Sequence, residues 1–258
     1  MPHAAGVGYK RYSSGSPAAA QPPLVLVHGA GGTRLHWPPT LRRFPGADVY
    51  ALDLPGHGEA PGPRQSTIEG YRQAVVEWMR ALELPPAVVV GHSMGGALAQ
   101  SLALEAPERV AGIVLVGTGA RLRVHPLLLE AAASGGLPTE TLATLVSWWY
   151  SADAPPRLRE LATRVLAATN TAVLHGDFLA CDGFDVMERL GMIDRPALVV
   201  VGEDDRMTPV KYARFLAETL PRARLEIIPG AGHMVMLEQP AAVERALSDW
   251  IQTNFPQA

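Results

Sequence analysis

The sequence predicts an α/β protein built on a doubly wound, mostly parallel sheet, and three observations support that prediction. Six short apolar runs, rich in valine, leucine and isoleucine, have the length of strands buried on both faces. Helix-length segments separate most of these runs, as they do in α/β folds. The chain has 258 residues, of which 48% are hydrophobic and 18% are charged, so it is long enough to bury one large core.

In the predicted strands, successive residues are nearly all apolar, and apolar and polar residues do not alternate. That pattern is typical of a parallel sheet covered by helices on both faces. RYSS (11–14) and the residues before it are expected to add one or two edge strands. The six strands are expected at 24–27, 49–54, 87–90, 112–116, 197–201 and 224–228.

Four helices are expected between or after these strands. The first begins with Ser-Thr-Ile-Glu, in which Ser66 and Glu69 have the spacing of a capping box. Two others have a proline near their start, where its missing N–H costs no helical hydrogen bond. The expected helices are 66–82, 94–106, 209–220 and 240–255.

Residues 119–195 interrupt the alternation of strands and helices. They contain no buried-strand signal, and helical patterns occur in them at 125–134, 139–150 and 155–168. We therefore expect a helical insertion carried by the sheet, with 1–118 and 196–258 forming the α/β core. When two edge strands are counted, the insertion follows the sixth strand.

Composition argues against several classes of protein. The 22 basic and 25 acidic residues give a net charge of −3, and no basic block is present, so we expect no nucleic-acid partner. Cys181 is the sole cysteine, which excludes an intrachain disulfide and a multi-cysteine zinc site. No apolar run is long enough to cross a bilayer and no secretory signal is recognisable, so we expect a cytoplasmic protein without a membrane span.

The strongest local signal is GHSMGG (91–96), which directly follows one predicted strand and precedes a predicted helix. It contains G-x-S-x-G, the nucleophile elbow, in the strand–turn–helix context that this motif requires. A serine at so sharp a turn needs small neighbours two residues away on each side, here Gly91 and Gly95. The helix that begins at Met94 directs its free amides and its positive end to the same point. The motif therefore indicates a nucleophile at Ser93, against the alternative of a glycine-rich turn with an incidental serine.

A serine is a poor nucleophile near pH 7 unless a base, held in turn by an acid, activates it. In elbow folds the chain order is serine, then a carboxylate, then histidine. Glu203, Asp204 and Asp205 follow the fifth of the six apolar runs, and His233 follows the last on a glycine-rich loop. Because functional groups of open α/β sheets gather at the carboxyl ends of the strands, we expect these residues to meet Ser93.

Five motifs along the chain stand in the order of one family. They are HGAGG (28–32), DLPGHG (53–58), GHSMGG (91–96), GEDDRMTP (202–209) and GAGH (230–233). On these motifs the chain resembles the alpha/beta hydrolase superfamily, and within it the small esterases, haloperoxidases and carbon–carbon bond hydrolases. The resemblance implies the α/β-hydrolase fold and identifies the insertion 119–195 as the variable cap of that family.

The resemblance also implies a role for each of five residues. Ser93 would be the nucleophile and His233 the base. Asp205 would be the acid, since it is the fourth position of the family's G-x-x-D-x-x-x-P pattern. The backbone amides of Ala30 and Met94 would form the oxyanion hole.

Neighbouring residues have plainer interpretations. Asp204 remains the alternative acid, because adjacent side chains cannot both face the histidine, and Glu203 is expected to face solvent. His28 and His57 are expected to hold their turns by bonding to backbone. Strand alternation predicts that His92 points away from the nucleophile.

The predicted cap is rich in aromatic side chains, which either wall an apolar acyl or aryl pocket or pack the cap onto the core. A free cysteine there is expected to behave as a small buried hydrophobe. No histidine or aspartate cluster has metal-ligand spacing, so we expect neither a metal nor another cofactor. The cap residues concerned are Trp148, Trp149, Tyr150, Phe178, Cys181 and Phe184.

The function that the resemblance implies is a serine hydrolase acting on a small-molecule ester or related acyl substrate. Two enzymatic alternatives stay open, a carbon–carbon bond hydrolase of a diketone and a cofactor-free perhydrolase or haloperoxidase. A third belongs to another class, a ligand receptor or regulator on the same fold. Dehalogenases and epoxide hydrolases are disfavoured, because they carry a carboxylate at the elbow. The natural substrate and the oligomeric state are not legible from the sequence.

Overall fold

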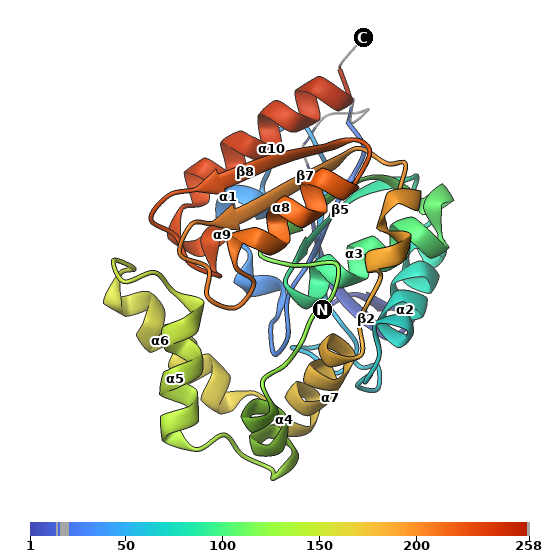
Figure 1. The fold of residues 1–258 in the computed structure, drawn as a ribbon. Helices are drawn as coiled ribbons and strands as arrows, with labels where there is room; N and C mark the ends of the chain where they lie inside the picture. The colour runs from blue at the N-terminus through green and yellow to red at the C-terminus, as the bar shows by residue number, and fades with distance from the viewer. Residues whose placement is uncertain (14, 16–20, 257–258) are drawn as a thin grey trace.

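A single mostly parallel sheet lies at the centre of the molecule (Figure 1). The computed structural model describes residues 1–13, 15 and 21–256. The strands are β1 (His3–Ala4), β2 (Val7–Tyr12), β3 (Leu24–Val27), β4 (Val49–Asp53), β5 (Ala87–His92), β6 (Val110–Val116), β7 (Ala197–Gly202) and β8 (Ala223–Ile228). Their spatial order is β1-β2-β4-β3-β5-β6-β7-β8.

The pairing of the strands confirms the predicted fold class. β3 to β8 run parallel to one another, whereas β1 and β2 pair antiparallel at one edge. The expected edge strands are therefore present, and Ser14, at the end of the segment in which they were predicted, lies outside the described residues.

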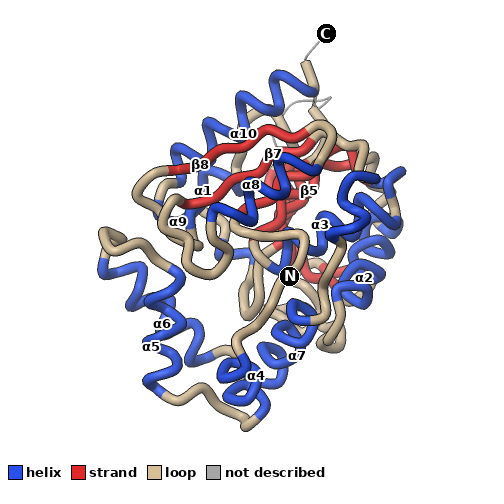
Figure 2. The backbone as a smooth tube through the Cα atoms, in the orientation of Figure 1, coloured by secondary structure: helices blue, strands red, loops and turns tan. Residues whose placement is uncertain are grey.

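Helices cover both faces of the sheet (Figure 2). The helices of the core are α1 (Pro39–Arg42), α2 (Ile68–Ala81), α3 (Met94–Glu105), α8 (Val210–Thr219), α9 (Val235–Glu238) and α10 (Pro240–Asn254), with 3-10 turns at η1 (Arg34–His36) and η2 (Pro107–Arg109). Buried residues of α2, α3 and α8 pack on one face, and those of α1, α9 and α10 pack on the other. The four helices predicted for this part of the chain are all present.

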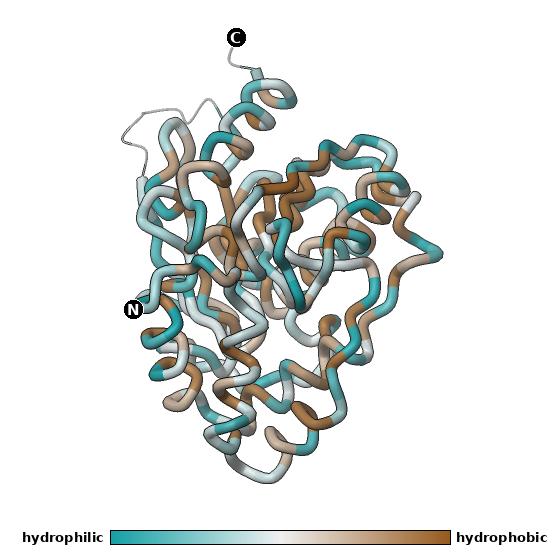
Figure 3. Tube along the Cα trace, turned by 60° about the vertical axis from the view of Figure 1, so that its left-hand side comes forward, coloured by the Kyte–Doolittle hydropathy of each residue, from teal (hydrophilic) through white to brown (hydrophobic). Residues whose placement is uncertain are grey.

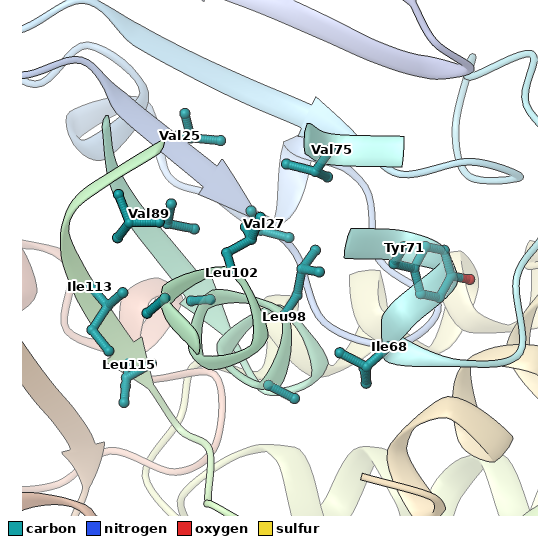
Figure 4. Close-up of a cluster of buried hydrophobic side chains, with 14 of the residues drawn as sticks. Val25, Val27, Ile68, Tyr71, Val75, Val89, Leu98, Leu102, Ile113 and Leu115 are labelled. Atoms are coloured by element: carbon teal, nitrogen blue, oxygen red, sulfur yellow. The ribbon is translucent and has the colours of Figure 1, made fainter. Parts of the chain in front are cut away.

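Successive residues of a strand enter opposite cores, as the pleat requires. Val25 and Val27 of β3 pack with Leu98 of α3 (Figure 4). Leu24 and Leu26 belong to the second core, on the far side of the sheet. Burial on both faces is the reason that the central strands have no polar alternation. Figure 3 shows hydrophobic stretches of the chain inside the molecule.

The insertion lies between β6 and β7 and is helical, as predicted. Its helices lie together below the sheet in Figure 1. They are α4 (Pro126–Ala133), α5 (Thr139–Trp149), α6 (Pro156–Ala168) and α7 (Thr171–Asp182), followed by the 3-10 helix η3 (Met187–Met192). We call residues 119–195 the cap. The boundaries of the cap and of the core, 1–118 and 196–258, remain a prediction.

Two details of the helices differ from the sequence-based expectation. Helix α7 was not predicted, because most of its residues are buried and no polar stripe marks its helical period. The N-cap of α2 is Thr67, whose side chain accepts a hydrogen bond from the amide of Gly70. The predicted capping box at Ser66 was therefore displaced by one residue.

No helix within the described ranges combines the length and the apolarity that crossing a bilayer would need.

Candidate active site

Ser93 occupies the turn between β5 and α3, as the elbow motif predicts. Its backbone has φ 53° and ψ −115°, a conformation that L-residues rarely adopt. Hydrogen bonds hold the residue on both sides. Its amide donates to the carbonyl of Val116 at 2.9 Å, and its carbonyl accepts from the hydroxyl of Thr118 at 2.8 Å. Contacts with β6 and the loop after it therefore stabilise the strained turn.

The two glycines of the motif allow the close approach of α3 to the strands. A Cβ atom on Gly91 would overlap the carbonyl of Gly95, the second residue of α3. A Cβ on Gly95 would overlap the carbonyl of Val27 and lie 2.8 Å from that of His28. The first turn of α3 therefore rests directly on the ends of β3 and β5.

Asp205 and His233 come together from the loops after β7 and β8. The Nδ1 atom of His233 lies 2.9 Å from Oδ2 of Asp205, and both side chains are buried. Because Nδ1 donates to the carboxylate, the neutral ring presents Nε2 as an acceptor. Ser93 and His233 line the same pocket.

The carboxylate of Asp205 is held in its ionised form. Both Met207 and Thr208 donate their amides to Oδ1 at 2.8 Å, and the hydroxyl of Thr208 donates to Oδ2 at 2.8 Å. Burial acts to raise the pKa of Asp205, but the charge of His233 and these hydrogen bonds outweigh it, so the pKa is lowered. The group can therefore stabilise a positive imidazolium.

The structure pairs Asp205 and not Asp204 with the histidine. Asp204 is exposed and lines a different hollow, together with the exposed Glu203.

The loop after β3 presents the amide that the resemblance assigns to the oxyanion hole. The carbonyl of Gly29 accepts from the amide of Gly32 at 3.1 Å and from Nδ1 of His28 at 2.8 Å. Among the described residues, no hydrogen bond to the amide of Ala30 is found. Met94 is the first residue of α3, where the amides have no acceptor within the helix. Both amides are therefore free to bind an anion.

A cavity of about 400 Å³ lies between this site and the cap. Apolar side chains line most of it, and its charged lining residues are Arg123 and Arg206. The predicted aromatic wall is right in part, because Tyr150 and Phe184 do not line the cavity. The predicted cap residues that do line it are Trp148, Trp149, Phe178 and Cys181. Burial raises the pKa of the Cys181 thiol, which agrees with the inert role expected for it.

The histidines near the site depart from the sequence-based expectation at one position. His92 does not simply point away, because its ring lies 4.7 Å from that of His233, and the residue is among those that line the cavity. Its Nε2 atom lies 3.0 Å from the carbonyl of His233. Burial, and then the neighbouring His233, lowers its pKa well below the usual value, so it is neutral. His28 does hold its turn as expected, since Nε2 accepts from the amide of Leu54 at 3.1 Å.

The sequence did not predict the residues that hydrogen-bond to the candidate catalytic residues. The hydroxyl of Thr208 donates to Asp205, and the hydroxyl of Thr118 donates to the carbonyl of Ser93. The only sequence signal for either role was the position of Thr208, three residues after the predicted acid. His36, whose pKa burial lowers to about 4, also lines the cavity. No group of three or more potential ligands that could hold a metal ion is found among the described residues.

Comparisons with known proteins agree with this geometry. A model of the alpha/beta hydrolase family matches residues 24–246. The chain belongs to the alpha/beta hydrolase family. It is similar to the solved structure of a thermophilic esterase, with 35% identity, a TM-score of 0.79 and coverage of 90% of each chain. It is also similar to a hydrolase from Pseudomonas aeruginosa PA01, with 31% identity, a TM-score of 0.82 and coverage of 95% of this chain and 94% of the other.

One curated relative is longer than this chain. The dihydrolipoyllysine-residue acetyltransferase component of the acetoin cleaving system of Pseudomonas putida is 31% identical over 256 residues, which cover 90% of this chain. The chain spans 64% of that protein's length, so the name of the whole relative describes more than the shared part. The family and the two solved structures identify the chain as a hydrolase.

The close approach of α3 to β3 predicts a large cost for any side chain at Gly95. We expect Gly95→Ala to lower the free energy of unfolding by about 3 kcal/mol or more, because the new methyl group meets rigid backbone. Urea unfolding followed by circular dichroism measures this. The control is Gly136→Ala, where a Cβ would meet nothing within 4 Å and the change should stay within about 0.5 kcal/mol. Equal stabilities of the two variants would show that α3 does not pack so closely.

Proposed function

We propose that this protein is a serine hydrolase that cleaves carboxylic esters, with Ser93, His233 and Asp205 as its catalytic triad. One observation carries the proposal. A buried, ionised Asp205 holds His233 by Nδ1 at 2.9 Å, and that ring shares a cavity with a serine on a strained elbow. A carboxylate, a histidine in one fixed tautomer and a serine hydroxyl that substrate can reach are the parts that acyl transfer to serine needs.

The proposed reaction runs in two halves. The Oγ atom of Ser93 attacks the ester carbonyl while Nε2 of His233 takes its proton, and Asp205 stabilises the imidazolium. The proton passes to the leaving alcohol, and the acyl group remains on Ser93. Water, deprotonated by His233, then attacks the acyl-enzyme. The bond from the acyl carbon to Oγ breaks, His233 returns the proton to Oγ, and the acid is released.

Two backbone amides would stabilise both tetrahedral intermediates. The negative oxygen forms between the amides of Ala30 and Met94, and the positive end of α3 adds to their field. Each such donor lowers the barrier by about 3–4 kcal/mol in comparable enzymes. Because these are backbone groups, exchanging one small side chain for another at Ala30 should change the rate little.

The cavity favours an ester with an apolar part of modest size. Its volume of about 400 Å³ is at the small end for ligand pockets, and Trp148, Trp149 and Phe178 supply apolar and aromatic wall. The thermophilic esterase at 35% identity supports ester cleavage over carbon–carbon bond cleavage or perhydrolysis, which stay alternatives. The serine at the elbow favours attack on a carbonyl over displacement at saturated carbon.

Replacing the proposed nucleophile should abolish turnover without unfolding the protein. We expect Ser93→Ala to lower kcat on short p-nitrophenyl esters by at least about 10³-fold. The free energy of unfolding should stay within about 1 kcal/mol, since alanine fits where serine fits. An organophosphonate should label the wild type at Ser93, which mass spectrometry of the peptide identifies.

Ser101→Ala is the matched control, because that serine also lies on α3 but outside the cavity, and its activity should be normal. Retention of more than a trace of activity in Ser93→Ala would remove Ser93 as nucleophile. A wild type that reacts once and then stops would favour the receptor alternative.

The adjacent carboxylates provide a second test. Asp205→Asn should lower kcat by about 10²–10⁴-fold, because the amide presents a donor to Nδ1 and no longer stabilises the imidazolium. Asp204→Asn should stay within about threefold of the wild type, since that side chain is exposed and makes no contact with His233. Steady-state kinetics on the same ester decide between them, and the reverse order would transfer the role of acid to Asp204.

A further inference from the structure

Asp177, on helix α7 of the cap, is a fully buried carboxylate that the proposed reaction does not use. Its Oδ2 atom accepts hydrogen bonds from the amide of Gly31 at 2.7 Å and from Nε2 of His57 at 2.8 Å. Its Oδ1 atom accepts from the hydroxyl of Tyr71. Gly31 follows β3, His57 follows β4, and Tyr71 lies on α2, so one cap carboxylate joins three segments of the core.

The hydrogen bonds of His57 show that this carboxylate faces a positive charge. Both ring nitrogens face acceptor oxygens, since Nε2 lies by Asp177 and Nδ1 lies 3.2 Å from the carbonyl of Pro55. Only an imidazolium can donate to both. Burial acts to lower the pKa of His57, but the hydrogen bond and charge of Asp177 and the nearby carbonyls outweigh it, so the pKa is raised.

The adjacent histidine has the opposite character. The rings of His28 and His57 are 4.7 Å apart, yet His28 accepts at Nε2 from Leu54 and lies by the carbonyl of Gly29 with Nδ1. That pattern belongs to the neutral ring. Burial, and then the charge of His57, lowers the pKa of His28 well below its usual value. The positive charge therefore resides on His57, next to Asp177.

These contacts fix the loop after β3, residues 28–32, on both sides of Ala30. We call this segment the oxyanion loop. Before it, the carbonyl of Gly29 is held by His28 and by the amide of Gly32. After it, the amide of Gly31 is held by Asp177. Gly31 has φ +63°, and a Cβ there would lie 3.0 Å from Leu174, which stands one turn before Asp177 on α7. The cap helix thus lies directly against the loop that presents the amide of Ala30.

We propose that Asp177 is a positioning residue, which orients the Ala30 amide toward the developing oxyanion by holding the next peptide group, and which the charged His57 holds in turn. The inference rests on the oxyanion role proposed for Ala30. It gives the cap a part in transition-state stabilisation, besides forming the wall of the cavity. Loss of the contact should therefore affect the rate of acyl transfer more than the binding of substrate.

The test compares two variants of Asp177 in the full-length protein. Asp177→Ala removes the acceptor, whereas Asp177→Asn keeps an oxygen for Gly31 and can donate its NH₂ to the oxygen of Tyr71. With p-nitrophenyl butyrate we expect Asp177→Ala to lower kcat about 10- to 100-fold, as for a misplaced oxyanion donor, with KM within about threefold. The kcat of Asp177→Asn should be about tenfold or more above that of Asp177→Ala, because asparagine restores the hydrogen bond to Gly31 without the charge.

Asp182→Ala is the matched control. Asp182 lies on the same helix and accepts from the backbone amide of Val124 at 3.1 Å, away from the oxyanion loop. We expect its kcat to stay within about threefold of the wild type. A purely structural role of Asp177 would lower the urea midpoint and leave kcat per folded molecule unchanged, and that result would overturn the inference, as would an equal loss of kcat in Asp182→Ala.

The rate of Ser93 phosphonylation by a p-nitrophenyl phosphonate separates this inference from the proposed function. The reagent forms a tetrahedral centre at the same oxygen site, and its rate should fall in Asp177→Ala by a factor similar to that for kcat. If the wild type is phosphonylated but hydrolyses no ester, ester hydrolysis fails as the function while the phosphonylation rates still test Asp177. Equal phosphonylation rates in the wild type and Asp177→Ala would overturn the role of Asp177 alone.

Discussion

The close packing of α3 against the carboxyl ends of β3 and β5 is the constraint on which the rest of the site depends. Gly91 and Gly95 permit it, because any side chain there would meet backbone carbonyls. The packing forces Ser93 into its strained turn and brings the loop after β3 against the first amides of α3. In the proposed site, the Ser93 hydroxyl, the amides of Ala30 and Met94 and the positive end of α3 act together at this end of the sheet.

The strain at Ser93 is compensated by its surroundings. The residue lies at φ 53°, and conformations of this kind cost about 1–3 kcal/mol. Hydrogen bonds to Val116 and from Thr118 fix both of its peptide groups, so the turn cannot relax while β6 stays in the sheet. The rigid interior of the sheet thus positions the half-buried side chain of the proposed nucleophile.

Buried charge near the site follows one pattern, in which each buried carboxylate faces a cation or a histidine. Asp205 faces His233, Asp177 faces His57, and the fully buried Asp53 faces Arg34. Several further hydrogen bonds satisfy each of these carboxylates, which is the condition under which buried charge is tolerated. Removing either partner would leave an uncompensated charge in the interior, so these pairs fix local geometry.

The sequence allowed much of this molecule to be predicted, because the signals were local. Continuous apolar runs marked the parallel strands, since both faces of the sheet are covered. The G-x-S-x-G turn and the count from Gly202 to Asp205 selected candidate residues that the structure brings to one edge of the sheet. Helix α7 and its Asp177 were not predicted, because a helix buried on most sides has no amphipathic period, and because the partners of Asp177 lie 106 to 146 residues away in the chain.

His92 is a second position at which a local sequence pattern did not predict the environment of a side chain. Strand alternation applies within a strand, but His92 is the last residue of β5 and the elbow begins immediately after it. Its ring therefore packs beside His233, at the edge of the cavity that the residue lines. Which loops converge on a strand end is a property of the tertiary fold, and local periodicity does not contain it.

We propose that the amides of Ala30 and Met94 form one oxyanion hole in front of Ser93. A crystal structure of the protein after reaction with a p-nitrophenyl phosphonate tests it most directly, because the phosphoryl oxygen occupies the position of the oxyanion. We expect phosphorus bonded to Oγ of Ser93, with that oxygen about 2.7–3.1 Å from both amide nitrogens. An adduct on another residue, or a phosphoryl oxygen turned away from both amides into solvent, would contradict the claim.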